Sequence, residues 1–337
     1  MDFDFSEDQL ALRDGARELL DDYASPTRVR AHTASGAGFD SDLWRAMTEQ
    51  GWLGIETREE QGGVGLGTVE AATLCEELGR HAGPAPLVPA LLAIDAFVTA
   101  GDDDWAQRLL SGDAIACVAW DPEAPVPYAP SADVAVVLAE GAVYAQEIYD
   151  QPPREPAIDL TRELGWLAFD RARARDIGGT AEHARLLDRG AALTSADLLG
   201  SAGRALDMAV EYAKDRVQFG RPIGSFQAVK HRCADMLVDV EGMRSTAYWA
   251  AWCIGAHDRD ASVAASTAKV WCSDASKRVM ASALQVHGGI GFTWEHDLHF
   301  FLKRAQLDQL AFGDAVAHRT RLAALLRPRV EAGESVV

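Results

Sequence analysis

The spacing of apolar residues predicts helices in the first third of the chain. Ser6 is a suitable N-cap for the first of them, and Asp40 begins a second that carries apolar residues as far as Trp52. The segment between them contains Pro26, Gly36 and Gly38 and is predicted to be a loop. The predicted helices cover residues 6–23, 40–52, 69–81, 89–100 and 105–110.

The second half of the chain shows long runs of helical spacing. One segment ends at Asp215, and a second leaves through Val229 to Met243 after a turn at residues 216–227. Gly220, Pro222 and Gly224 rule out a continuous helix through that turn. Further helices are predicted over 261–286 and 297–326, followed by a polar tail after Pro328. Successive amphipathic helices of this length favour a four-helix bundle.

The middle of the chain has a different pattern. Short apolar runs at 114–120 and 164–170 predict strands, and runs at 134–138 and 142–145 flank Glu140-Gly141 as in a hairpin. We therefore expect a mainly α protein with a small β domain. Its expected divisions are a helical N-terminal domain (1–112), a shortened β domain (113–179) and a C-terminal four-helix bundle (180–328).

Charge and composition exclude several classes of function. The chain of 337 residues has a formal net charge of -19, which argues against nucleic acid or an anionic membrane surface as partner. The five cysteines lack metal-ligand spacing and are expected to be reduced core residues. No apolar run reaches membrane-spanning length, and the first residues do not form a secretion signal. A cytoplasmic location is the expectation.

The turn at residues 216–227 carries the most distinctive chemistry. It offers a guanidinium (Arg216), an aromatic face (Phe219) and two amide side chains (Gln218 and Gln227). That set suits a phosphate together with a flat ring system. A polar corner between two helices is the structural alternative.

The same stretch resembles the R-x-T/Q-F-G-x-x-I/L-x-x-x-Q signature of the acyl-CoA dehydrogenases, flavoenzymes that oxidise acyl thioesters. Residues 285–292 are similar to the family's Q-x-x-G-G-x-G, and residues 51–55, 62–65 and 76–80 match its N-terminal region. The resemblance implies the three-part fold expected above. It also implies FAD as cofactor and an acceptor such as electron-transfer flavoprotein. The nucleotide of a neighbouring subunit would then be contacted by Arg216, Gln218, Phe219, Gln227, Gln285, Gly288 and Gly289.

The family's catalytic glutamate has no counterpart. Counting from Lys303-Arg304-Ala305 places Phe312 at the glutamate position, and the alternative position used by some members falls near Gly190. Phenylalanine and glycine cannot remove a proton. Asp308 and Asp314 are the nearest carboxylates to the first position and are expected to be solvated helix charges.

The family's flavin-ring segment is also incomplete. Residues 119–122 echo the start of its T-E-P-x-x-G-S, but no Gly-Ser follows. The resemblance thus predicts the non-catalytic subunit of a heteromeric, α2β2 acyl-CoA dehydrogenase, as in bacterial steroid side-chain degradation. A partner would supply the base and the flavin-ring pocket. Two alternatives remain: a homomeric enzyme whose base is Asp308 or Asp314, and a catalytically dead scaffold or binding protein.

Overall fold

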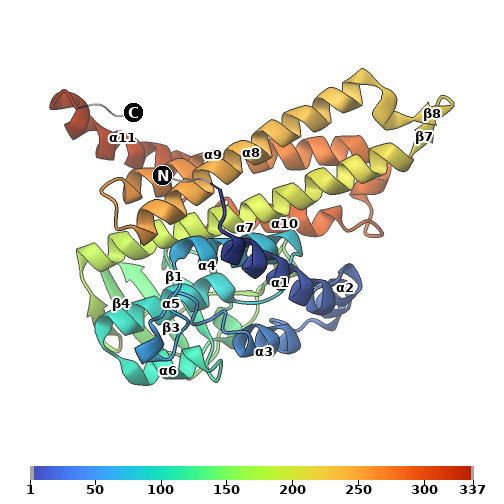
Figure 1. The fold of residues 1–337 in the computed structure, drawn as a ribbon. Helices are drawn as coiled ribbons and strands as arrows, with labels where there is room; N and C mark the ends of the chain where they lie inside the picture. Colours follow the sequence, from blue (N-terminus) through green and yellow to red (C-terminus); the bar gives the residue numbers. More distant parts are fainter. Residues whose placement is uncertain (1–3, 335–337) are drawn as a thin grey trace.

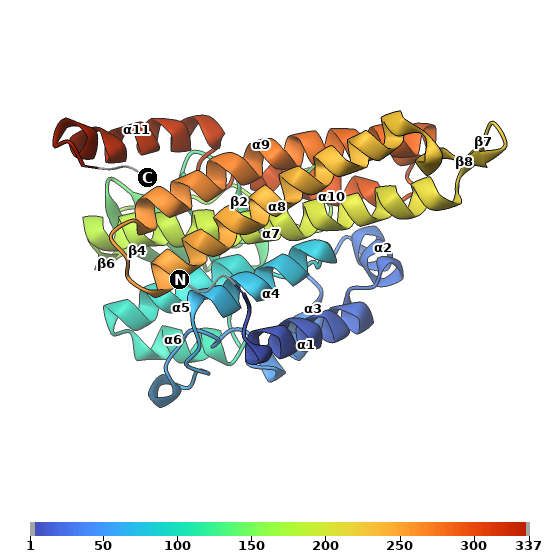
Figure 2. The ribbon, with the colours of Figure 1, turned by 45° about the horizontal axis from the view of Figure 1, so that its top comes forward.

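A computed structural model describes residues 4–334. Long helices of the C-terminal half lie side by side along one side of the molecule, and the N-terminal helices and the sheet lie against them (Figure 1). Turning the molecule shows the N-terminal helices and α4 lying under α7 (Figure 2). This arrangement confirms the mainly helical fold with a small β part.

The N-terminal part is built from short helices with well-formed ends. Ser6 accepts a hydrogen bond from the Gln9 N–H while the Gln9 side chain accepts one from Ser6, which is a capping box. The predicted loop around Pro26 is wrong, because Pro26 starts a helix and Gly36 ends it in the left-handed conformation. The helices are α1 (Glu7–Tyr23), α2 (Pro26–Ser35), α3 (Ser41–Glu49), α4 (Thr68–Arg80), α5 (Leu87–Ala100) and α6 (Asp103–Leu110).

The β part centres on a four-stranded sheet in the order β1-β3-β4-β6. The predicted hairpin is confirmed, since β3 (Val134–Ala139) and β4 (Ala142–Glu147) pair antiparallel. The predicted strand over 164–170 shrinks to β5 (Leu164–Gly165), which pairs with β2 (Val126–Pro127). The remaining strands are β1 (Ala116–Ala119), which runs parallel to β3, and β6 (Arg175–Gly178), which pairs with β4.

The C-terminal half begins with a single helix of 36 residues, α7 (Thr180–Asp215). It packs along α8 (Gln227–Gly255) and α9 (Ala261–His287). The predicted last helix over 297–326 is wrong as one element: α10 (Leu298–Asp308) and α11 (Ala315–Glu331) are separate helices. Phe312 and Gly313 have positive φ angles of 56° and 97°, which no α-helix accommodates.

Two glycines allow α4 and α7 to cross at backbone distance. A Cβ on Gly200 would lie 1.8 Å from the Glu76 carbonyl oxygen, and one on Gly79 would lie 2.1 Å from the Asp197 carbonyl oxygen. The Ser201 hydroxyl donates a hydrogen bond to the Gly79 carbonyl at 3.1 Å. This crossing fixes the N-terminal helices against the bundle and sets the walls of the site described below.

Within residues 4–334 we find no helix that combines the length and the apolar character needed to cross a membrane. All five cysteines are free thiols, and all but the half-buried Cys233 are buried, as the sequence predicts.

Candidate functional site

The turn that follows α7 forms a small hairpin beyond the end of that helix (Figure 1). Its strands, β7 (Val217–Gln218) and β8 (Arg221–Pro222), pair antiparallel around Phe219 and Gly220. Both of these tip residues have positive φ, as a two-residue hairpin turn requires. Phe219 is 92% exposed. A non-glycine residue in this conformation, with its ring in solvent, indicates a segment shaped for contact with something outside the chain.

The predicted nucleotide contacts on this hairpin all face outward. Arg216, Gln218 and Gln227 are exposed. Within residues 4–334 the Arg216 guanidinium has no hydrogen bond or ion pair, and the Gln218 amide donates only to the neighbouring Val217 carbonyl, at 2.7 Å. The Arg216 guanidinium therefore remains available to a ligand or to another chain.

The second predicted loop is equally open. Gln285 is exposed near the end of α9, and the short 3₁₀ turn η4 (Gly288–Phe292) follows directly. Gly288 has φ 61° and ψ -140°, a conformation that essentially only glycine adopts. A Cβ on Gly288 or Gly289 would meet no atom within 4 Å. Packing inside this chain therefore does not require a glycine at 289, whereas close approach of a ligand to the backbone would.

Phe312 lies in the break between α10 and α11 and is only 4% exposed. A Cβ on Gly190 in α7 would lie 2.3 Å from the Phe312 ring. The two positions at which the sequence analysis looked for a glutamate, Phe312 and Gly190, are thus in direct contact in this fold. The other face of the ring packs against Trp120, with 4.8 Å between centroids.

This aromatic pair stands between two hollows. The inner one is a cavity of about 50 Å³, whose floor includes Asp197, Arg304 and Asp308. The outer one is an open cleft of about 690 Å³ between the Trp120–Pro125 loop and α11. Trp120 and Phe312 line both. The inner cavity has room for about one or two water molecules, not for an acyl chain.

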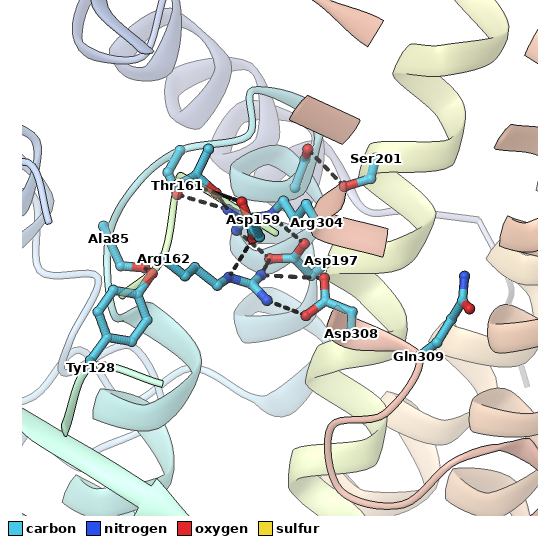
Figure 3. A network of polar contacts seen from close by, with 12 residues as sticks. Ala85, Tyr128, Asp159, Thr161, Arg162, Asp197, Ser201, Arg304, Asp308 and Gln309 are labelled. Atoms are coloured by element: carbon cyan, nitrogen blue, oxygen red, sulfur yellow. Dashed lines mark hydrogen bonds and ion pairs between the residues drawn. The ribbon is translucent and has the colours of Figure 1, made fainter. Parts of the chain in front are cut away.

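A buried network of charges (Figure 3) borders the inner cavity, which Phe312 also lines. Arg162, from the segment before β5, forms an ion pair with Asp308 and a second one with Asp197 at 3.1 Å. Arg304 of α10 binds the Asp197 carboxylate through two hydrogen bonds of 2.8 and 2.6 Å. It also donates to the Thr161 hydroxyl and the Gly83 carbonyl. The network thereby joins the β part, α7 and α10.

Burial raises the pKa of Asp308 to about 7, although Arg162 acts against that change. Burial also acts to raise the pKa of Asp197, but Arg304 and Arg162 outweigh it and hold this pKa below its usual value. The prediction that Asp308 is a solvated helix charge is therefore wrong, because its side chain is buried and paired. Asp314 is exposed and caps α11 by accepting the Ala317 N–H at 2.8 Å.

Lys269 of α9 supports the segment that carries Phe312. Its buried ammonium donates to the Asp308 and Gln309 carbonyls at 2.9 and 3.0 Å and to the Ser273 hydroxyl at 3.3 Å. These bonds satisfy carbonyls at the end of α10 that lack a helical partner. Burial lowers the pKa of Lys269 to about 8. The sequence analysis missed Lys269 and Arg162, because a single basic residue within an apolar pattern carries no signal of its burial.

Comparisons with known proteins match the two helical parts of this chain to one family. Residues 6–114 match the family model "Acyl-CoA dehydrogenase, N-terminal domain", and residues 178–326 match "Acyl-CoA dehydrogenase, C-terminal domain". The chain is 37% identical to "Acyl-CoA dehydrogenase IpdE2" of Mycolicibacterium smegmatis, over 89% of this chain and 93% of that protein. It is 30% identical to "Acyl-CoA dehydrogenase FadE27" of Mycobacterium tuberculosis, over 96% of this chain and 98% of that one.

Solved structures show the same fold. A variant of the "Tcur3481-Tcur3483 steroid ACAD" superposes with a TM-score of 0.90 at 29% identity, covering 96% of this chain and 99% of that one. A chain of the ChsE4-ChsE5 complex from Mycobacterium tuberculosis gives a TM-score of 0.87 at 30% identity, covering 97% and 99%. The extent and the identity of these matches show that the chain belongs to the acyl-CoA dehydrogenase family, a family of oxidoreductases.

Proposed function

We propose that this chain is the non-catalytic subunit of a heteromeric acyl-CoA dehydrogenase. In a complex of α2β2 form, it completes the FAD site of a catalytic partner subunit, which contributes the glutamate base and the flavin-ring pocket. When bound, FAD supplies the acceptor for the β-hydride of the acyl thioester. This chain would hold the nucleotide end of that FAD.

The observation that carries the proposal is the contact of Phe312 with Gly190. Proton abstraction from an acyl-CoA requires a base within hydrogen-bonding reach of the α-carbon proton. Here both expected base positions hold residues that cannot accept a proton, and the Phe312 ring packs on Trp120. The residues present do not fit a flavin ring and an acyl group in this chain.

The residues at the other end of the bundle do fit the nucleotide part of FAD. Arg216 has no partner within residues 4–334 and can pair with a diphosphate oxygen. Open space above Gly288 and Gly289 lets a phosphate or ribose approach the backbone. The exposed Phe219 ring would gain about 1.5–3 kcal/mol by burial against a partner or the cofactor. The predicted roles of Gln218, Gln227 and Gln285 belong to this proposal.

The carboxylates of this chain argue against a homomeric enzyme with a relocated base. Asp308 is buried in its contacts with Arg162, and the cavity beside it has a volume of about 50 Å³. Asp314 is engaged in capping α11. Asp314 does line the open cleft of about 690 Å³, but its carboxylate is engaged there in the helix cap.

Relatives suggest the substrate and the partner. One close structural neighbour is described as a steroid ACAD and another as a ChsE4-ChsE5 complex of two named components. By analogy, we propose a bulky acyl-CoA such as a steroid side-chain thioester as substrate, and reoxidation by a carrier such as electron-transfer flavoprotein. We also propose a cytoplasmic location and a division into parts at residues 1–112, 113–179 and 180–328.

Coexpression with the acyl-CoA dehydrogenase encoded beside this chain tests the proposal. The expected product is a yellow complex that holds one FAD for each partner subunit and forms enoyl-CoA, while this chain alone is colourless and inactive. Arg216→Ala should weaken FAD binding by about 10- to 100-fold, because it removes a charge-assisted contact worth about 1.5–3 kcal/mol. The matched control is Arg259→Ala, an exposed arginine in the connection between α8 and α9.

The outcomes separate the possible functions. A colourless mixture that elutes as two species would reject the heteromer. Bound FAD and enoyl-CoA formation by this chain alone would select the homomeric enzyme. A yellow complex whose flavin content is unchanged by Arg216→Ala would select the scaffold.

A further inference from the structure

A column of rings lies between the Arg216 turn and the Gly288–Gly289 loop, the two segments proposed above to hold the nucleotide. Tyr212, near the end of α7, stacks on His287, the last residue of α9, with 4.9 Å between centroids and 29° between planes. His296 packs on His287 as well, at 4.4 Å. Burial lowers the pKa of His287 and of His296, so the two imidazoles meet uncharged.

Each ring is held by the backbone around it. His287 is 3% exposed, and its Nδ1 donates to the Ala283 carbonyl at 2.8 Å. The His296 Nδ1 accepts the Leu298 N–H at 3.2 Å. A Cβ on Gly291 would lie 3.0 Å from the His287 Cβ, so η4 folds directly onto His287. The imidazole of His287 is thus fixed in one orientation.

Tyr212 is equally close to the first turn. The Arg216 N–H donates to the Tyr212 carbonyl at 2.9 Å, which makes this the last hydrogen bond of α7. The Ile223 N–H then donates to the Arg216 carbonyl at 2.8 Å and closes the base of the hairpin. The backbone of Arg216 is therefore anchored at Tyr212. Gly288 is the residue after His287, the residue on whose ring Tyr212 stacks.

We propose that the stacked rings of Tyr212 and His287 are positioning residues that set the distance between the Arg216 turn and the Gly288–Gly289 loop, and so the affinity of the complex for the nucleotide part of FAD. This inference rests on the function proposed above. Neither ring touches the cofactor. The rings act by fixing the relative position of the Arg216 turn and the Gly288–Gly289 loop, whose own side chains are exposed.

The test compares ring-keeping with ring-removing variants in the coexpressed complex. Tyr212→Leu removes the stack, and Tyr212→Phe keeps it. His287→Leu and His287→Phe form a second pair at the other ring. The complex is stripped of flavin, and its dissociation constant for FAD is measured by fluorescence titration beside its thermal midpoint without FAD. Arg216→Ala is measured in the same series.

We expect both leucine variants to weaken FAD binding by about 2- to 10-fold, the equilibrium factor that corresponds to one aromatic pair. Both phenylalanine variants should restore wild-type affinity. In apo samples of Tyr212→Leu, amide hydrogen exchange should become faster in residues 216–223 and 288–292 and stay unchanged at the far end of α8. A merely structural role would lower the thermal midpoint without this local pattern.

Two results overturn the inference in different ways. If Arg216→Ala weakens FAD binding but the leucine variants at both positions do not, the ring stack has no positioning role and the proposed function stands. If none of the three positions affects FAD binding, the proposed function and the inference fall together. Should Tyr212→Leu prevent folding, the His287→Leu and His287→Phe pair decides in its place.

Discussion

The contact between Gly190 and Phe312 predicts that Gly190→Ala changes the stability of the fold in opposite directions with and without the aromatic ring at position 312. Gly190→Ala adds one methyl group to α7, with its carbon 2.3 Å from the Phe312 Cδ1 and Cε1 atoms. Comfortable carbon contacts lie at about 3.5–4.0 Å, so the overlap exceeds 1 Å. The ring has little room to retreat, because Trp120 packs against it with centroids 4.8 Å apart.

Two opposing effects set the magnitude. Alanine inside a helix is favoured over glycine by about 0.8–1 kcal/mol. Overpacking a filled core costs about 1–3 kcal/mol, and an overlap of this size belongs at the upper end. In the wild-type background Gly190→Ala should therefore destabilise the fold by about 2 kcal/mol. With Phe312→Ala in place the clashing ring atoms are gone, and Gly190→Ala should then stabilise the fold by up to about 1 kcal/mol.

The assay is a double-mutant cycle on the isolated chain, followed by urea unfolding and by thermal melting. We expect a coupling energy of about 2–3 kcal/mol, the upper part of the range for residues in contact. At an unfolding entropy of about 2.1 cal/mol/K per residue, 2 kcal/mol lowers the melting temperature of this chain by about 3 °C. If the alanine has the same effect in both backgrounds, Phe312 does not occupy the space above Gly190, and the argument for a filled base position is refuted.

The other predictions concern the network below the ring and the helix crossing. Arg162→Met should lower the free energy of unfolding in urea by about 3–5 kcal/mol, because it leaves Asp308 buried without its cation. The double variant Arg162→Met/Asp308→Leu should recover part of that free energy. If the single and the double variant lose the same free energy, the two residues are not paired. Because burial lowers the pKa of Lys269 to about 8, the unfolded chain binds a proton that the folded chain lacks between about pH 8 and 10.5. Wild type should thus gain about 2 kcal/mol relative to Lys269→Met between pH 8 and 10, and a flat difference would show that the ammonium is not buried. Gly200→Ala places a carbon 1.8 Å from a carbonyl oxygen and should destabilise the fold by more than about 3 kcal/mol. Gly203→Ala in the same helix should be neutral or slightly stabilising. Thermal melting of both variants tests whether α4 and α7 cross at backbone distance.

Much of the fold was predictable because it depends on local periodicity. The N-cap at Ser6, the start of the second predicted helix at Asp40 and the hairpin around Glu140-Gly141 are local signals, and each is confirmed. Two predictions of helix boundaries were wrong, because proline and glycine signals for the start and the end of a helix were misread. A proline such as Pro26 suggests a loop, yet proline is also favoured in the first turn of a helix, and that is where Pro26 lies. Gly313 followed by Asp314 marks a helix end and a new N-cap, a signal that the apolar pattern on both sides obscured.

In the candidate site, too, the residue types could be predicted from the sequence, whereas their contacts could not. Arg216, Gln218, Phe219 and the Gly288–Gly289 pair stand in short motifs, so their residue types could be recognised without a structure. The proximity of the two motifs in space involves contacts such as the stacking of Tyr212 on His287, which lie 75 positions apart in the chain. Sequence spacing carries no information on such a contact.

Residue types and their spacing were enough to indicate the family and the order of the helical and β parts, and they predict that no glutamate stands at either base position. These properties depend on residue identity and on spacing within single elements. The three-dimensional arrangement was needed to show that Phe312 packs on Gly190, that Asp308 is a buried partner of Arg162, and that the Arg216 guanidinium has no partner within residues 4–334. The physical reason is that burial, ion pairing and steric closure depend on groups that distant segments bring together, and the free energies of these contacts are set by distance in space.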